Sequence, residues 1–187
     1  NGKNGNGNGK VTTTNGKTEV TEQKQKCTNK RQALSQLRRL KWNLEFRSKN
    51  QQKFFEEIAN NDVTFCSGPA GCGKTFLAVY YALQAIAEKG STYDGVVIVK
   101  PLVEADGEKL GFLPGDIEEK VEPFMWSYYY NIEQIIGHTK MGVLLNDSVI
   151  QIIPLAYMRG LTLAGKIVIL DESQNTTPEQ VKMFLTR

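Results

Sequence analysis

The sequence predicts an α/β fold, a three-layer α/β/α sandwich built around a mostly parallel sheet. Short apolar runs alternate along the chain with longer segments of helical character. Within these runs polar and apolar residues do not alternate, which indicates strands that are covered by helices on both faces. The length of 187 residues and the hydrophobic content of 40% suffice for one such domain and a tail.

The apolar pattern also gives the expected order of the elements. Strands are predicted at residues 63–67, 96–100, 149–153 and 167–170. Helices are predicted at residues 51–59, 75–89 and 178–185. Punctuating residues follow three of these elements, as is typical of element ends: Gly90, Pro101 and Pro154.

The chain divides into three regions. Residues 1–30 are rich in Gly, Asn, Lys and Thr and hold too few apolar side chains to offset the entropy of ordering, so we expect a disordered tail. Residues 31–49 form a basic connecting segment, which docks on the core as a short helix or strand or, alternatively, contacts RNA. Its leucines have helical spacing: Leu34, Leu37, Leu40 and Leu44. Residues 50–187 form the α/β domain.

Charge is distributed unevenly between the two parts of the chain. Residues 1–53 hold 13 Lys and Arg against 3 Asp and Glu, a net charge of +10, whereas residues 54–187 hold 10 against 17, a net charge of −7. A basic arm can bind RNA or DNA phosphates by releasing counterions, and a solvated tail is the alternative.

The composition also bears on location and redox chemistry. The chain has no apolar run of about 18 residues and a polar beginning, so we expect a cytoplasmic protein without a membrane partner. Its 3 cysteines are an odd number without metal-site spacing, and neither a disulfide nor a zinc role is expected.

A glycine-rich segment between the first strand and the next helix matches G-x-x-x-x-G-K-[ST]. In such a loop, glycines let the backbone wrap a polyphosphate, and the amides at the helix start point toward the anion. Lys74 is predicted to reach the β and γ phosphates of ATP, and Thr75 to ligate Mg²⁺. The predicted ATP-binding residues are Gly68, Pro69, Ala70, Gly71, Cys72, Gly73, Lys74 and Thr75.

Two carboxylates follow the predicted strand at 167–170. A parallel strand ends at the edge of the sheet where ligands bind, so these side chains are expected beside the phosphate loop. Asp171 is predicted to hold Mg²⁺, and Glu172 to orient and deprotonate the attacking water.

Four blocks of sequence resemble the successive motifs of PhoH-like proteins, with a match over about residues 50–187. They are GPAGCGKTFLAV (68–79), GEKLGFLPGDIEEKVEPF (107–124), PLAYMRGLTL (154–163) and ILDESQNTTPEQVKMFLTR (169–187). PhoH-like proteins are cytoplasmic P-loop ATPases related to superfamily-one helicases. The resemblance implies Mg-dependent ATP hydrolysis coupled to single-stranded RNA or DNA. An ATP-binding switch or tether without strand translocation is the alternative.

The resemblance also implies roles for individual residues. Gln51 stands where the family places a glutamine like that of the helicase Q motif, and its amide can pair with adenine. Lys100 follows the second strand, where the family usually has Arg and helicase-like enzymes contact nucleic acid. Arg159 is a second candidate for phosphate contact, with an ordinary surface ion pair as its alternative. The aromatic run at 126–130 is expected to pack in the core or an interface, rather than to stack bases.

The position of the last residue, Arg187, predicts a domain truncated at its C-terminus. In the family, the next strand bears a Gly-Asp motif and lies between the phosphate-loop strand and the Asp-Glu strand. Without it we expect unpaired edges and marginal stability. A later arginine of the family approaches the γ phosphate, and a neighbouring subunit of a homo-oligomer is an alternative source.

Overall fold

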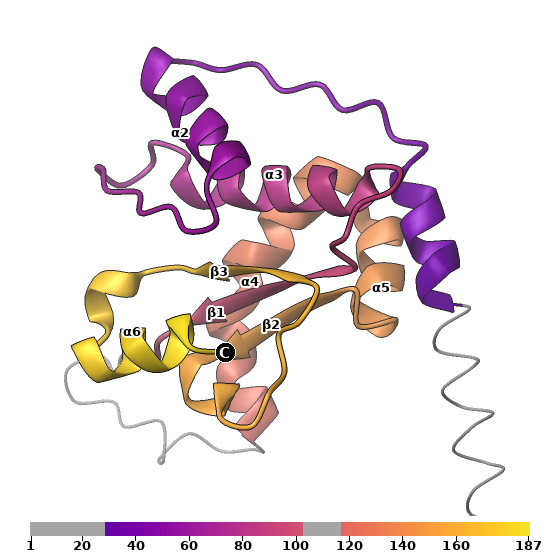
Figure 1. Cartoon of the computed structure of the whole chain (residues 1–187). Helices are drawn as coiled ribbons and strands as arrows, with labels where there is room; N and C mark the ends of the chain where they lie inside the picture. Colours follow the sequence, from indigo (N-terminus) through magenta and orange to yellow (C-terminus); the bar gives the residue numbers. More distant parts are fainter. Residues whose placement is uncertain (1–28, 103–116) are drawn as a thin grey trace, which may run out of the picture.

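The computed structural model describes residues 29–102 and 117–187, with side chains in α4 described from residue 123 (Figure 1). Residues 29–37 are helical. The other helices are α2 (Lys49–Asn60), α3 (Lys74–Ala87), α4 (Ile117–Ile136), α5 (His138–Asn146) and α6 (Pro178–Leu185). The strands are β1 (Gly95–Lys100), β2 (Ile150–Pro154) and β3 (Lys166–Leu170). Two short 3₁₀ turns follow β2 and β3: η2 (Leu155–Met158) and η3 (Ser173–Asn175).

The three strands form a parallel sheet in the order β2-β1-β3. Val97 in the middle of β1 lies opposite Gln151 of β2 and Val168 of β3. The central strand is almost entirely buried, whereas every residue of β3 is partly exposed. The predicted α/β class and the parallel sheet are therefore confirmed.

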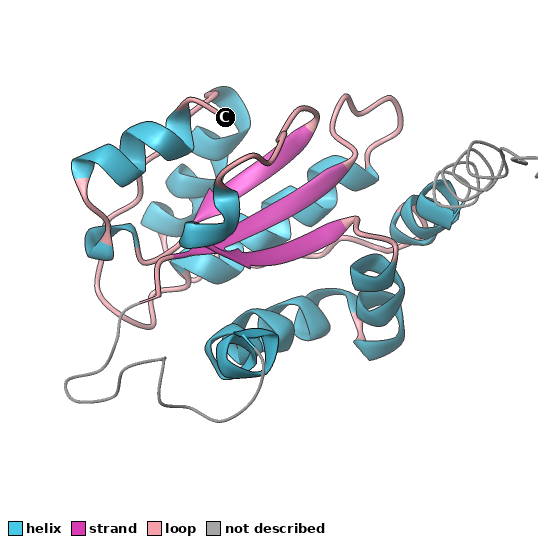
Figure 2. Ribbon diagram, turned by 90° about the horizontal axis from the view of Figure 1, so that it is seen from below, coloured by secondary structure: helices cyan, strands magenta, loops and turns pink. Residues whose placement is uncertain are grey.

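Helical elements cover both faces of the sheet, which gives the predicted three layers (Figure 2). Alternate residues of β1 point to opposite faces, because successive side chains of a strand do so. Val96 and Ile98 belong to a core formed with α3, α4, α5 and the helix at 29–37. Val97 and Val99 belong to a smaller core that includes η2 and side chains of α6.

The basic segment before α2 docks through the helix at 29–37. Ala33, Leu34 and Leu37 are buried in the larger core, so the predicted docking is present in helical form. Asp94 holds the start of this helix to the sheet, since its carboxylate accepts hydrogen bonds from Lys30 Nζ and Lys166 Nζ at 2.6 Å each. Burial alone would raise the pKa of the Asp94 carboxyl, but these hydrogen bonds outweigh it and lower that pKa below its ordinary value.

The strand predicted at residues 63–67 is wrong, because this segment pairs with no strand in the described part of the chain. Val63 and Phe65 are 56% and 78% exposed, although their residue types favour burial. A strand requires hydrogen bonds from a neighbour, and the apolar pattern alone does not supply one. Residues 103–116, which contain the first ten residues of the motif block at 107–124, lie outside the described residues, as do residues 1–28.

Gly95 is required by the close approach of the neighbouring strands at the start of β1. A Cβ at this position would lie 2.8 Å from the Val149 carbonyl oxygen and 3.0 Å from Lys166 Nζ. The Val149 carbonyl cannot move freely, because it accepts the Val96 amide in the β1–β2 ladder at 2.8 Å. The central strand can therefore begin here only with glycine.

We predict that Gly95→Ala destabilises the protein by about 1–3 kcal/mol, the usual cost of forcing extra volume into a packed site. Gly142→Ala in α5 is the matched control, because nothing lies within 4 Å of its added methyl group. That variant should be stabilised by about 0.5–1 kcal/mol through helix propensity. Urea denaturation of both variants measures the difference, and equal stability would show that the close approach at Gly95 is unimportant.

Candidate functional site

The carboxyl ends of the parallel strands gather the predicted site residues at one edge of the sheet. Lys100 is the last residue of β1, and Asp171 comes directly after β3. The Asp171 amide donates to the Val99 carbonyl at 3.0 Å, which continues the β1–β3 ladder to the site. This is the edge where open parallel sheets bind ligands.

The phosphate loop depends on two glycines with positive φ. Gly71 has φ +74° and Gly73 has φ +88°, a region that other residues rarely occupy. Gly73 is also the N-cap of α3, and a Cβ there would lie 3.2 Å from Gln51 Nε2. The first amides of α3 therefore remain without a side-chain cap and are available to an anion.

Lys74 is folded back into the loop. Its ammonium group donates hydrogen bonds to the carbonyl oxygens of Gly68 and Pro69, both at 2.8 Å. Its Nζ atom also lies 3.8 Å from Cys72 Sγ. The loop thus holds a positive charge close to the exposed amides of α3, an arrangement suited to a polyphosphate.

Gln51 links α2 to the phosphate loop. Ser48 caps α2 by accepting the Gln51 amide, which fixes the start of the helix. The Gln51 side chain accepts from the Arg47 amide at 2.8 Å and donates to the Cys72 carbonyl at 3.0 Å. Its carboxamide therefore positions the loop backbone, and pairing with adenine remains a prediction.

Thr75 and Asp171 are brought into direct contact. Thr75 Oγ1 donates to Asp171 Oδ2 at 3.0 Å, although 96 positions separate the two residues. A hydroxyl and a carboxylate are hard oxygen donors that fit Mg²⁺, which takes few protein ligands and completes its shell with phosphate and water. No cluster of three or more His, Cys, Asp or Glu side chains occurs within residues 29–102 and 117–187. The described residues thus fit Mg²⁺ bound together with a nucleotide.

Glu172 lies at the same edge but points to solvent. Its backbone is left-handed, with φ +51°, which costs of order 1–3 kcal/mol in a residue other than glycine and is common at functional sites. Its carboxylate accepts a short hydrogen bond from Gln174. The structure therefore places Glu172 next to Asp171 in the chain, without a hydrogen bond from its carboxylate to Thr75 or Asp171.

Tyr128 of α4 is a site residue that the sequence does not reveal. Its hydroxyl donates to Asp171 Oδ2 at 3.0 Å. Burial raises the pKa of this hydroxyl strongly, and the negative charge of Asp171 raises it further, so the group is a donor at neutral pH. The only sequence signal is its place in the aromatic run, where burial is expected without a polar role.

The two nucleic-acid candidates differ in their surroundings. Lys100 Nζ lies 5.5 Å from the centre of the Tyr128 ring and 3.4 Å from the Phe124 carbonyl oxygen. Arg159 follows η2, is exposed, and forms no ion pair with a residue in the described part of the chain. Lys100 is therefore packed against the site, whereas the Arg159 guanidinium faces solvent.

A hollow of about 660 Å³ opens between α2, residues 63–67 and the phosphate loop. Gln51 and Lys74 line it, together with the partly apolar surface of Phe54 and Phe65. Its cysteines, Cys66 and Cys72, are free thiols. This hollow adjoins the loop in which a nucleotide phosphate is expected and has the size of a small-molecule site.

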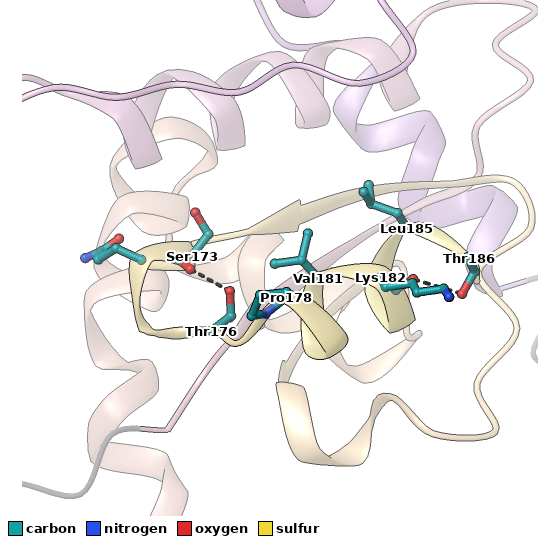
Figure 3. Close-up of a pocket in the computed structure, with 8 residues that line it drawn as sticks. Ser173, Thr176, Pro178, Val181, Lys182, Leu185 and Thr186 are labelled. Atoms are coloured by element: carbon teal, nitrogen blue, oxygen red, sulfur yellow. Dashed lines mark hydrogen bonds between the residues drawn. The ribbon is translucent and has the colours of Figure 1, made fainter.

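A second hollow of about 670 Å³ lies on η3 and α6 (Figure 3). Val181 and Leu185, one helical turn apart, supply its apolar surface, and Lys182 lies beside them. None of the predicted ATP-binding residues lines this hollow.

Known proteins that are similar to this chain share one family description. The sequence model of the PhoH-like protein family matches residues 43–187. A PhoH-like protein of Synechocystis is 50% identical over 137 residues, which are 73% of this chain and 41% of the relative. A PhoH-like protein of Bacillus subtilis is 45% identical over 145 residues, or 78% of this chain and 44% of the relative.

Protein PhoH of Escherichia coli is 40% identical over 143 residues, which are 75% of this chain and 40% of that protein. The chain therefore spans less than half the length of these relatives. None of the helices in the described ranges is long and apolar enough to cross a membrane. Because the family model matches residues 43–187, which is more than half of the chain, and these relatives are 40–50% identical to it, the chain belongs to the PhoH-like protein family.

Proposed function

We propose that this chain binds Mg-ATP at the phosphate loop and that the protein hydrolyses ATP in a reaction coupled to single-stranded RNA or DNA. The observation that carries the proposal is the 3.0 Å hydrogen bond between Thr75 Oγ1 and Asp171 Oδ2. It joins the end of the phosphate loop to the end of β3, the two places from which P-loop proteins hold a nucleotide-bound magnesium ion.

Each part of the nucleotide has a candidate partner in the described residues. The amides at the start of α3 and the Lys74 ammonium group bind phosphate oxygens. Thr75 and Asp171 hold Mg²⁺, which when bound neutralises charge on the β and γ phosphates. The hollow beside Gln51 receives the base, with the side-chain amide in reach of its polar edge.

Glu172 is proposed as the general base. A carboxylate accepts a proton from the attacking water, and its exposed position leaves it accessible to water at the edge of the sheet. The hydrogen bond from Gln174 keeps the carboxylate oriented. Asp171, which is engaged by two hydroxyl groups, serves the metal instead.

Lys100 and Arg159 are proposed to bind the nucleic-acid backbone. Lys100 ends β1, and Arg159 comes after β2 and η2, so both lie at the carboxyl ends of strands, as Asp171 does. This position allows strand binding to affect the nucleotide site. An ATP-binding switch or tether is the competing function, and it would show no stimulation of ATP hydrolysis by single-stranded RNA.

Lys74→Ala should weaken Mg-ATP binding roughly 10- to 150-fold, which corresponds to the removal of a charge-assisted hydrogen bond of about 1.5–3 kcal/mol. Isothermal titration calorimetry measures the affinity. Lys182→Ala is the matched control, since this lysine lies on α6 away from the loop. Unchanged affinity in Lys74→Ala would refute the assignment of the loop.

Glu172→Gln should retain Mg-ATP while losing turnover, because the amide can hydrogen-bond water but cannot accept its proton. The loss is expected to be about 10²- to 10⁴-fold, the usual contribution of general-base catalysis. Phosphate release and nucleotide affinity are measured side by side, with Glu45→Gln as an exposed carboxylate control. Turnover at the parent rate would place the base elsewhere.

Lys100→Gln and Arg159→Gln should each weaken binding of a fluorescent single-stranded RNA and flatten its salt dependence. Removing one phosphate-binding charge lowers the slope of log affinity against log salt by about 0.7. Fluorescence anisotropy at several salt concentrations measures this slope, and Lys182→Gln removes a charge from α6 as the control. Slopes identical to the parent would remove both residues from the proposed nucleic-acid surface.

A further inference from the structure

Tyr128 occupies the buried face of α4, which otherwise contributes apolar side chains to the larger core. Met125, Ile132 and Ile136 lie on the same face, one and two helical turns away, and carry no hydroxyl or charged group. Tyr128 is 1% exposed. Burying a hydroxyl costs free energy unless the group forms a hydrogen bond, so the Tyr128 hydroxyl is expected to have a partner.

The partner is the carboxylate of Asp171, 43 positions away at the carboxyl end of β3. Within the described residues, the two donors to this carboxylate reach the same oxygen, Oδ2: Tyr128 and Thr75, each at 3.0 Å. Thr75 is expected to present its own oxygen to the metal. The Tyr128 hydroxyl would then be the donor that continues to hydrogen-bond the Asp171 carboxylate when the metal is bound.

The ring of Tyr128 is held in place by core packing and by Lys100. Its ring is packed in the larger core with side chains of α4 and β1. Lys100 lies over the ring, with Nζ 5.5 Å from the ring centre, and the same Nζ donates to the Phe124 carbonyl in α4. A donor on a rigid helix fixes the orientation of the group it binds more closely than one on a loop.

The geometry points to Tyr128 as a positioning residue, which orients the Asp171 carboxylate for Mg-ATP through its hydroxyl. This inference rests on the proposed nucleotide-binding function. Tyr128 does not touch the nucleotide in this assignment and acts only through Asp171. Partners that orient metal-binding side chains typically contribute 10- to 100-fold to metal affinity.

Tyr128→Phe tests the inference, because it removes one oxygen atom and retains the buried ring. In the intact protein, affinity for a fluorescent ATP analogue is measured in EDTA and again during a titration with Mg²⁺. We expect the Mg²⁺ concentration for half-maximal tight binding to rise about 10- to 100-fold. Affinity in EDTA should remain at the parent value, because the hydroxyl does not touch the phosphate loop.

Tyr80→Phe is the matched control, because Tyr80 is a buried tyrosine of α3 whose ring packs among Trp42, Phe55 and Phe76. It should leave the Mg²⁺ requirement unchanged. Tyr128→Leu provides a second hydroxyl deletion, and thermal unfolding shows which variants fold as the parent does. A merely structural tyrosine would change the unfolding temperature without changing the Mg²⁺ requirement.

The outcomes separate the two proposals. If the parent binds the analogue and the folded Tyr128 variants need no more Mg²⁺ than Tyr80→Phe, the positioning role is overturned while the nucleotide site stands. If the parent binds no analogue in either condition, the proposed function fails, and the positioning role fails with it.

Discussion

The carboxylate of Asp171 is the point at which three separate parts of the chain meet. It extends from the end of β3 and accepts hydrogen bonds from α3 through Thr75 and from α4 through Tyr128. Its position is set by the parallel pairing of β3 with β1, which the Asp171 amide continues by donating to the Val99 carbonyl. A one-residue slip in this register would turn the carboxylate to the opposite face of the sheet. The candidate site therefore depends on the correct alignment of two strands.

Helix α4 connects this carboxylate to the surface where nucleic acid is proposed to bind. Its buried face contributes Tyr128 to the site, while Trp126, 62% exposed, lies on the outer face. Lys100 contacts both the Tyr128 ring and the backbone of the helix at Phe124. The same side chain thus lies next to the tyrosine that binds Asp171 and at the edge of the sheet where nucleic acid is proposed to bind. Any movement of Lys100 toward a phosphate would change the packing of that tyrosine.

Much of this arrangement could be predicted from local sequence, and the parts that could not depend on distant partners. Apolar runs identified β1, β2 and β3, because parallel strands that helices cover on both faces carry few polar residues. The same reasoning failed at residues 63–67, where the composition fits a strand but no described neighbour pairs with it. The glycine pattern predicted the turn before α3, where Gly71 and Gly73 have positive φ, because glycine itself determines that backbone geometry. The hydrogen bond of Tyr128 to Asp171 could not be predicted, because its partner lies 43 positions away and its neighbours are equally aromatic.

The Lys74 ammonium group donates two hydrogen bonds to carbonyls of its own loop, and these carbonyls compete with any anion that binds there. The carbonyls of Gly68 and Pro69 belong to the same chain as Lys74, so their effective concentration near the ammonium group is high. An anion that binds Lys74 must displace them. A small anion offers little more than it displaces, because exchanging one set of hydrogen bonds for another yields a small net free energy. A polyphosphate that also engages the α3 amides and Thr75 gains several interactions for the same exchange. A nucleotide bound as proposed would therefore gain more from displacing the Lys74 hydrogen bonds than inorganic phosphate would.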